Sequence, residues 1–313
     1  MSAIIKYCFL LPAYKAKFLD AAIQSILNQT YTNFRLLISD DCSPENLWAI
    51  VEKYMSDGRV AYRRNQVNMG QKDLVSHWDL LVDKCDSPYF ILASDDDVYM
   101  PDFLMQIDSC IRDYPNVAIF RGRTSMIDSE GTIFREDIAY PEVQDQIEYG
   151  KSFLNECSII CISNCVFRTS RFKELGGFVN FPLAWKSDTT TQFRIAVDGI
   201  VHTTNGTVFL YRASGENIST MTRNTRIDRD KLNAVLRACY WIDTVPVDEN
   251  SEYLKRFFKT RLQGESRSYY WLCNFEDFVA LYRAFCSLDC FPSNKSKLTF
   301  VSHWCINKIL GRK

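Results

Sequence analysis

Three adjacent aspartates, Asp95 to Asp97, follow a short apolar run and stand four residues before Pro101. Carboxylates held this close together repel one another, and a bound cation would offset that repulsion. A cation held by few carboxylates, with open coordination positions, is typical of Mg²⁺ or Mn²⁺ shared with phosphate oxygens. The structural alternative is a cap for the helix that follows, because a helix N-terminus favours a carboxylate. One aspartate satisfies a cap, so the run of three favours a ligand site.

A second acidic pair, Asp40 and Asp41, also ends an apolar run. The hydrophobic periodicity of the first third alternates between buried strands and amphipathic helices. Strands are expected at 4–11, 34–41, 59–65 and 89–94, and helices at 18–27, 47–55, 72–82 and from Pro101 onward. This order predicts an α/β fold with right-handed crossovers and a doubly wound, mainly parallel sheet flanked by helices. Ligands of such sheets bind beyond the carboxyl ends of the strands, where both acidic clusters fall.

Composition limits the partners and leaves the function open. The 313 residues include 37 Lys and Arg against 38 Asp and Glu, so no strong field favours nucleic acid and we expect no such partner. The twelve cysteines are scattered and no secretory signal precedes them, which predicts reduced thiols in a cytoplasmic protein. No apolar run approaches the roughly 18 residues of a spanning helix. The motifs GxGxxG and GxxxxGK[ST] are missing, which disfavours a dinucleotide dehydrogenase and a P-loop kinase.

The stretch "LLPAYKAKFLDAAIQSILNQTYTNFRLLISDDCSPENL", followed by "SDDDVYMPDFL", resembles the family-2 inverting glycosyltransferases with the Rossmann-like GT-A fold. The resemblance covers most of residues 3–220, and its motifs occur in the family's order and spacing. It implies that the opening loop lines the donor site, that the second aspartate of "DD" contacts the nucleotide base, with uracil favoured, and that the first supports it. The residues so implied are Pro12, Ala13 and Tyr14 for the loop, Asp41 for the base contact and Asp40 for its support.

Within the triple aspartate, the resemblance implies a metal site. Asp96 is implied as the metal-coordinating residue, Asp97 as a further ligand and Asp95 as a contact to the ribose or a support for the site. The family's usual aspartate two places earlier is Ala93 or Ser94 here. A bound Mn²⁺ or Mg²⁺ would bridge the two phosphates and neutralise the charge that develops as the nucleoside diphosphate leaves.

A later segment, "ELGGFVNFPLAWKSDTTTQFRIAVDG", resembles the part of the family that carries the general base. It implies that Asp188 takes the proton of the acceptor hydroxyl, while Ser187 stands in place of a usual acidic residue. A cap for the following helix is the structural alternative for Asp188, and the two roles are compatible. Trp185 is expected either to stack on an acceptor sugar or to pack as a buried aromatic.

Three basic residues are candidates for contact with the donor phosphates. "RRNQVNMGQKD" resembles a family segment near the donor, which makes Lys72 or Arg64 a candidate, helped by a helix N-terminus. "FLYRASGENIST" resembles the family's closing strand and mobile loop, with Arg212 as a pyrophosphate contact and Asn217 to Ser219 in a lid. The alternatives are a solvated surface position for Lys72 or Arg64 and a surface ion pair for Arg212.

We divide the chain into a GT-A domain, 1–225, and a helical C-terminal region, 226–313. The first comprises a nucleotide-binding part, about 1–115, and an acceptor part, about 116–225. Aromatic stripes at helical spacing predict that the second packs against the first. Its last stretch, "KLTFVSHWCINKILGRK", either docks on the protein or touches, with Lys308, Arg312 and Lys313, an anionic membrane that carries a lipid-linked acceptor.

The sequence therefore predicts a metal-dependent, inverting transfer of a sugar from a nucleotide sugar, with uridine favoured, to a hydroxyl of a saccharide or lipid-linked saccharide. The expected setting is bacterial surface polysaccharide biosynthesis. One alternative is a sugar nucleotidyltransferase, although "LPAYKAKF" lacks the glycines usual in that class. The other is a catalytically inactive nucleotide-binding or scaffold protein of the same fold, an interpretation that rests on Ala93, Ser94 and Ser187.

Overall fold

The computed structural model describes most of the chain. The described residues are 4–155, 158–197, 199–215, 217, 224–246, 249–270, 272–287 and 294–309. Two of the sequence predictions therefore lie partly outside them. These are Ile218 and Ser219 of the predicted lid, and Arg312, Lys313 and the side chain of Lys308 in the predicted membrane contact.

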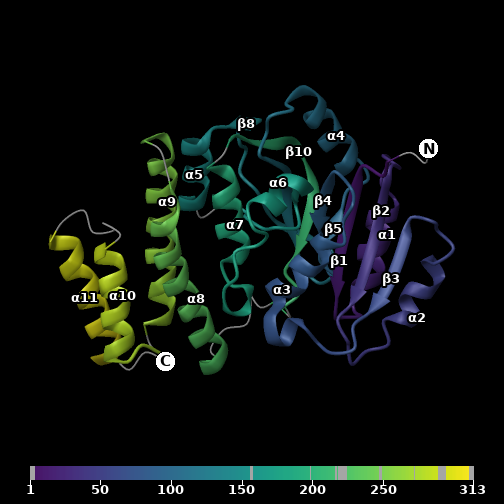
Figure 1. Ribbon diagram of the computed structural model, residues 1–313. Coiled ribbons are helices and arrows are strands. Elements are labelled where there is room, and N and C mark those ends of the chain that lie inside the picture. The colour runs from purple at the N-terminus through teal and green to yellow at the C-terminus, as the bar shows by residue number, and fades with distance from the viewer. Residues whose placement is uncertain are drawn as a thin grey trace.

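The N-terminal half forms the parallel sheet that the periodicity predicted (Figure 1). Strand β1 (Tyr7–Ala13) pairs in parallel with both β2 (Phe34–Asp40) and β4 (Tyr89–Leu92). Strand β3 (Val60–Arg64) pairs in parallel with β2. All four residues of β4 are buried, as expected for a parallel strand covered on both faces.

Helices cover both faces of this sheet. They are α1 (Leu19–Leu27), α2 (Trp48–Val51) with a 3₁₀ turn (Glu52–Tyr54), α3 (Gly70–Asp83) and α4 (Phe103–Asp113). The alternating side chains of β1 explain the two layers: Phe9 belongs to a buried cluster with α1 and α4, whereas Leu10 belongs to a second cluster with α3. The helices predicted from periodicity are thus confirmed, with α4 beginning two residues after Pro101.

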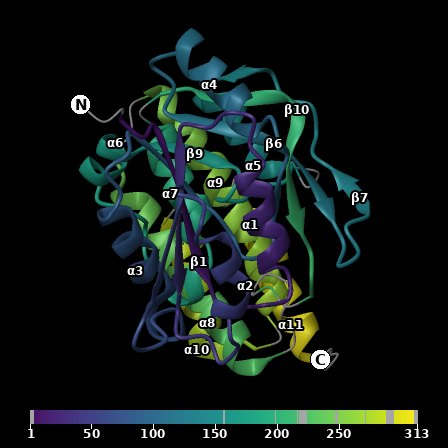
Figure 2. The same cartoon turned by 90° about the vertical axis from the view of Figure 1, so that its right-hand side faces the viewer.

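The second half of the sheet is mixed. Its strands are β5 (Val98–Tyr99), β6 (Ile119–Ile127), β7 (Ile133–Glu136), β8 (Val143–Gln144), β9 (Cys165–Arg168) and β10 (Val201–Arg212). The sheet continues from β4 in the order β9, β6, β10, β5. Strand β9 is antiparallel to both β4 and β6, whereas β10 is parallel to β6. The β6–β7 hairpin projects at one edge of the molecule (Figure 2).

The remaining elements are helical. They are α5 (Gln146–Leu154), α6 (Thr169–Glu174), a 3₁₀ turn (Pro182–Ala184), α7 (Ser187–Ala196), α8 (Thr225–Thr244), α9 (Glu249–Ser266), a 3₁₀ turn (Arg267–Tyr269), α10 (Phe275–Ser287) and α11 (Asn294–Ile309). The predicted helical C-terminal region is confirmed. Within the described residues, none of the helices combines the length and the apolar character that crossing a bilayer requires.

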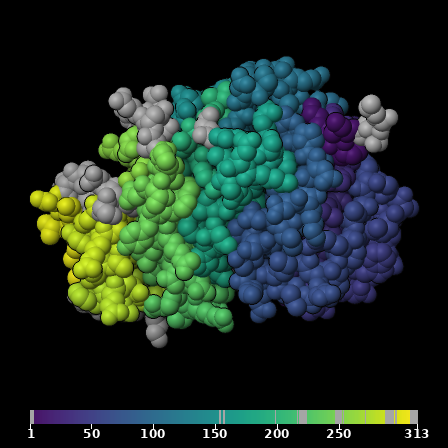
Figure 3. All heavy atoms as spheres, in the orientation of Figure 1, coloured from purple at the N-terminus to yellow at the C-terminus, as the bar shows by residue number. Residues whose placement is uncertain are grey.

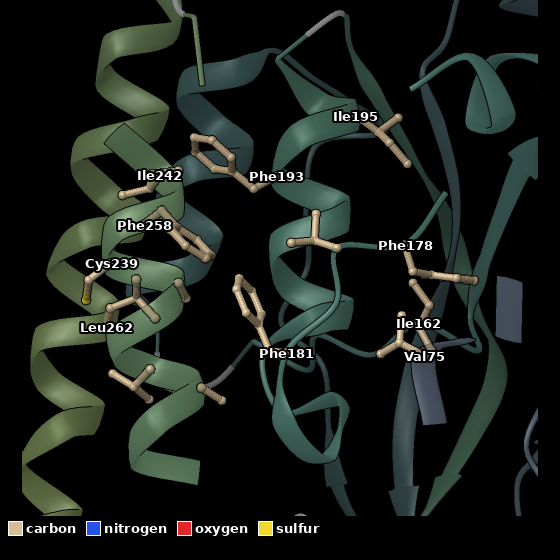
Figure 4. Packing of buried hydrophobic residues seen from close by; sticks show 14 of the residues in the cluster. Val75, Ile162, Phe178, Phe181, Phe193, Ile195, Cys239, Ile242, Phe258 and Leu262 are labelled. Carbon is tan, nitrogen blue, oxygen red and sulfur yellow. The ribbon is translucent and has the colours of Figure 1, made fainter. Parts of the chain in front are cut away.

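The C-terminal helices share a buried core with the rest of the protein. One cluster runs from Leu10 of β1 to Phe300 of α11. Within it, the ring centroid of Phe193 of α7 lies 5.0 Å from that of Phe258 of α9 (Figure 4). It also lies 6.4 Å from the ring centroid of Trp241 of α8. On the face shown in Figure 3, the green atoms of α8 and α9 lie against teal atoms of the preceding half. The division at residue 225 stays a prediction, and unfolding can test it.

We expect Phe258→Ala to lower the free energy of unfolding by about 3–5 kcal/mol, because the ring is fully buried and packs against Phe193 of α7. Urea unfolding followed by far-UV and near-UV circular dichroism should show one cooperative transition in both proteins. Tyr240→Ala on α8 is the control, since half of that side chain is exposed, and should change the free energy by less than about 0.5 kcal/mol. Two separated transitions would instead support an independent helical domain.

Candidate active site

A cavity of about 1240 Å³ opens at the carboxyl ends of β1, β2 and β4. Residues from distant parts of the sequence line it, including the segments after these strands, the segment before α7 and the end of α9. The sequence-predicted residues on its wall are Pro12, Ala13, Tyr14, Asp41, Asp95, Asp96, Asp97, Trp185, Asp188 and, from the predicted lid, Asn217. Four other predicted residues, Asp40, Arg64, Lys72 and Arg212, lie outside the lining.

Asp95 ties the loop after β1 to the end of β4. Its Oδ2 accepts hydrogen bonds from the backbone N–H groups of Tyr14 and Lys15, both at 2.8 Å. Burial raises the pKa of the Asp95 carboxyl, and the charge of Asp96 adds to the rise while Lys15 opposes it. Asp95 therefore fixes the position of the predicted donor loop. Its contact to a ribose stays a prediction.

Lys15 supplies a cation beside the crowded carboxylates. Its Nζ lies 2.6 Å from Asp96 Oδ2 and 3.3 Å from Asp95 Oδ1. Burial lowers the pKa of the ammonium, but the charges of Asp95 and Asp96 outweigh burial and leave that pKa above its ordinary value. Ser94 donates its hydroxyl to Asp96 Oδ1. Lys15 was not predicted from the sequence, although it directly follows Tyr14 in the motif.

Asp97 and Arg212 support the run of three aspartates, Asp95 to Asp97 (here called the aspartate triad), from the side of β10. The Asp97 side chain is almost fully buried, and its Oδ1 accepts the backbone N–H of Arg212 at 2.9 Å. Burial and then the charge of Asp96 raise the pKa of Asp97 well above its ordinary value. The Arg212 guanidinium donates to the Asp96 carbonyl at 2.9 Å and lies 4.4 Å from the centre of the Phe18 ring. It thus holds the turn of the triad, and its contact to pyrophosphate stays a prediction.

The residues present fit a metal ion only if a bound substrate supplies further ligands to it. Among the described residues, no three His, Cys, Asp or Glu side chains converge to hold a metal by themselves. Mg²⁺ needs only one or two carboxylates when substrate phosphates complete its coordination. Asp96 meets that requirement on the cavity wall. Because Lys15 contacts its Oδ2, a metal there would share that carboxylate with the ammonium or displace it.

Asp41 organises the turn that leads into α3. Its Oδ1 accepts hydrogen bonds from Asn65 Nδ2 at 2.7 Å and from the Met69 N–H at 2.9 Å. Its Oδ2 accepts the Gly70 N–H at 2.6 Å. A Cβ at Gly70 would lie only 2.9 Å from this oxygen, which explains a glycine here. His77 Nδ1 lies 3.6 Å from the same oxygen, in the cavity lining.

Asp40 lies beneath Asp41 and is wholly buried. Its Oδ1 accepts the Ser43 N–H at 2.8 Å, and its Oδ2 accepts the Tyr62 hydroxyl at 2.7 Å and a guanidinium N–H of Arg64. Arg64 also donates to the Ser43 carbonyl at 2.8 Å. These contacts join β2, β3 and the loop of Asp41. The other basic candidate, Lys72, is exposed on α3, and its phosphate contact stays a prediction.

Asp188 is the second residue of α7 and faces the cavity. Its Oδ1 accepts the Thr189 N–H at 2.7 Å, and none of the described residues donates to its Oδ2. Burial raises the pKa of the Asp188 carboxyl, while Lys186 opposes the rise. The neighbouring Ser187 is fully buried, and its hydroxyl accepts the Phe181 N–H at 3.1 Å. The serine at this position therefore has a structural role of its own, as the buried acceptor of a backbone N–H group.

The end of α9 forms a wall opposite the strand ends. Its contributions, together with the turn that follows, are Arg261, Glu265, Ser268 and Tyr269. None of these was predicted from the sequence. Beside them, the ammonium groups of Lys186 and Lys231 lie 4.8 and 4.5 Å from the centre of the Trp185 ring. Trp185 therefore already makes cation–π contacts, and its stacking on an acceptor sugar stays a prediction.

Comparison with known proteins gives one family. The model of that family, described as Glycosyl transferase family 2, matches residues 8–176. Protein CgeD of Bacillus subtilis (strain 168) is 29% identical over 107 residues, which are 33% of this chain and 25% of CgeD. The Escherichia coli protein WfgD, named as a UDP-Glc:alpha-D-GlcNAc-diphosphoundecaprenol beta-1,3-glucosyltransferase, is 26% identical over 214 residues, 67% of this chain and 78% of WfgD. The chain thus spans about a quarter of the length of CgeD and most of WfgD.

Solved structures share the fold. TarS of S. aureus in complex with UDP-GlcNAc superimposes with a TM-score of 0.73 at 14% identity, covering 90% of this chain and 80% of that one. The mannosyltransferase PcManGT of Pyrobaculum calidifontis, in complex with GDP-Man and Mn²⁺, gives a TM-score of 0.56 at 13% identity, covering 98% and 81%. These likenesses confirm the GT-A fold predicted from the sequence.

We expect Asp40→Ala to lower the free energy of unfolding by about 2–3 kcal/mol, because it leaves the Ser43 N–H and the Tyr62 hydroxyl without their buried acceptor. Urea unfolding measures the loss. The control is Asp86→Ala, which removes an exposed carboxylate 3.5 Å from Arg35 and should cost less than about 0.5 kcal/mol. Equal effects of the two substitutions would contradict a supporting role for Asp40.

Proposed function

Because the chain belongs to glycosyl transferase family 2, we propose that it transfers a sugar, with inversion, from a UDP-linked donor to a hydroxyl of a saccharide or lipid-linked saccharide in bacterial surface polysaccharide biosynthesis. The observation that carries the proposal is the meeting of Asp41, Asp96 and Asp188 around one cavity. Two of these carboxylates stand at strand ends suited to a nucleotide diphosphate, and the third stands at a helix start across the cavity.

The relatives support the choice of donor and acceptor. The printed name of WfgD gives a UDP-glucose donor and a diphosphoundecaprenol-linked acceptor. TarS structures hold UDP or UDP-GlcNAc, whereas PcManGT holds GDP-Man. A uridine donor is therefore favoured, and a guanosine donor is the alternative to test.

The proposed reaction is a single displacement. The acceptor oxygen forms a bond to the anomeric carbon of the donor sugar from the face opposite the diphosphate. Asp188 accepts the hydroxyl proton, and the bond from the anomeric carbon to the phosphate oxygen breaks with its electrons leaving on the nucleoside diphosphate. The raised pKa makes the Asp188 carboxylate a stronger base than an exposed aspartate.

The departing diphosphate carries negative charge that the site must neutralise. Lys15 supplies one positive charge at the edge of the triad. Asp96, with Asp97 as a further ligand, would hold Mn²⁺ or Mg²⁺, and the bound ion would stabilise the charge on the leaving phosphate oxygens. The structural role of Ser187 removes one reason for considering the protein inactive, because its serine fits a buried hydrogen bond.

A lipid-linked acceptor would place the enzyme at the cytoplasmic face of a membrane. Helix α11 supports this part of the proposal, since Leu298 is 70% exposed and Ile306 is 48% exposed. Apolar side chains on the surface of a helix can enter the headgroup region of a bilayer.

Calorimetric titration with UDP, GDP and TDP, each with and without Mn²⁺, tests the donor site. We expect UDP to bind most tightly, with an affinity that rises when Mn²⁺ is present. In Asp96→Asn the rise should disappear, because the neutral amide is a poor partner for a divalent cation. Absence of binding by all three nucleotides would overturn the proposed function.

Asp188→Asn tests the base. We expect the transfer rate to fall about 10²–10⁴-fold while UDP affinity stays unchanged. The control is Asp102→Asn, an exposed carboxylate outside the cavity, which should keep full activity. In the wild type, kcat/KM should fall as pH drops through the raised pKa of Asp188, so the acid limb should lie above the ordinary value of about 3.9. An acid limb that persists in Asp188→Asn with full activity would exclude Asp188 as the base.

A further inference from the structure

The segment that leads into Asp188 has an unusual backbone. Leu183, Ala184 and Lys186 have φ angles of 58°, 54° and 71°, in the left-handed region that side chains disfavour. Among the described residues, only Cys42 shares this feature without being glycine. Such conformations persist when the surrounding structure fixes them. Something must therefore hold the chain two residues before the proposed base.

Helix α9 holds this segment by an ion pair. Lys186 Nζ lies 2.6 Å from Glu265 Oε2, with side chains that are only 13% and 23% exposed. Arg261 donates to the other Glu265 oxygen at 2.9 Å and so orients the carboxylate. The Lys186 carbonyl accepts the Thr190 N–H at 2.9 Å, which places Lys186 at the N-cap of α7. One residue thus joins the start of α7 to α9.

A second attachment lies seven residues farther along the chain, about two helical turns from Lys186. Phe193 of α7 packs against Phe258 of α9, with ring centroids 5.0 Å apart. Figure 4 shows the rings of Phe193 and Phe258 next to each other between these helices. The apolar contact fixes the distance between α7 and α9, and the ion pair fixes the first turn of α7. Asp188 lies in that first turn.

We propose that Glu265 is a positioning residue: through Lys186 it fixes the first turn of α7 and aims Asp188 at the acceptor hydroxyl. The inference rests on the proposed function. It assigns to the C-terminal helical region a part in the reaction, because Glu265 and Arg261 lie beyond the residues that the family model matches. A small misplacement of a reacting group is sufficient to slow a reaction by about 10²-fold.

The same pair sets the charge around the base. The titratable groups that act on Asp188 are Lys186, which lowers its pKa, and Glu265, which raises it. On the other side, Cys165 of β9 interacts with Asp188. Removing Glu265 and removing Lys186 should therefore move the acid limb of the pH profile in opposite directions. A purely structural contact would not produce this pattern.

The test compares Glu265→Gln, Lys186→Met and the double variant by UDP release from UDP-glucose with a GlcNAc-diphospholipid acceptor. We expect each single variant to lower kcat at least tenfold with UDP affinity unchanged, and the double variant to lose no more than the worse single one. The acid limb should move to lower pH in Glu265→Gln and to higher pH in Lys186→Met. The control is Glu252→Gln, an exposed position on the same helix, which should behave as the wild type.

The outcomes separate this inference from the function on which it rests. Turnover by the wild type, with an unchanged kcat and pH profile in Glu265→Gln, would overturn the positioning role alone. Additive losses in the double variant would also overturn it, because the two residues would then act independently. The proposed function, and the inference with it, would be overturned by a wild type that binds UDP but turns over neither donor. Such a protein would release no UDP from UDP-glucose and no GDP from GDP-mannose. Thermal unfolding of Lys186→Met shows whether the variant is folded. A loss of activity that is due to misfolding would also count against the positioning role.

Discussion

The crowding of three carboxylates at the carboxyl end of β4 is the constraint on which the rest of the site depends. Each aspartate meets it by a different means. Asp95 accepts two backbone N–H groups, Asp96 contacts the Lys15 ammonium, and Asp97 has a raised pKa. The first two solutions come from the loop after β1, so they require β1 to lie beside β4. The backbone that bonds Asp97 comes from β10, which pairs with β5 directly after the triad. The strand order of the sheet therefore determines how the charge of the three aspartates is stabilised.

Sequence periodicity predicted the parallel half because each strand there is a compact apolar run followed by an amphipathic helix. It could not specify β9, whose four residues gain their antiparallel pairing only from β4 and β6, both far away along the chain.

The same limit applies to the site. Asp41 and Asp95–Asp97 could be found because they cluster at strand ends, and Asp188 because it lies in a recognisable segment. Lys15 and Glu265 could not, since their roles arise from contacts with Asp96 and Lys186 that local sequence does not encode. Ser187 was open to misinterpretation for the same reason, because the Phe181 N–H that it serves is visible only in the fold.

The two sides of the cavity differ in how they are built. The proposed donor side is made of strand ends and short loops within residues 8–176, where the family model matches. The proposed acceptor side is made of the segment before α7 and the end of α9, beyond that match. Donor recognition is common to nucleotide-sugar enzymes, since the diphosphate needs positive charge and the nucleobase needs a pocket with hydrogen-bonding groups. Acceptors differ, and the wall that would meet them lies where family similarity ends.

This division constrains how the acceptor side can change. Phe193 and Phe258 lie in the buried cluster that continues to Leu10 of β1, so α7 and α9 cannot shift without disturbing the sheet that carries the aspartates. Ser268 is not bound in this way, because it lines the cavity and is exposed, whereas Tyr269 lines the cavity but belongs to the buried cluster. Glu265 stands at the boundary between these two sets, because it lines the cavity and also holds Lys186. A substitution there would change the shape of the proposed acceptor wall and the aim of the proposed base together. The proposed acceptor selectivity and rate are therefore coupled at this residue by geometry.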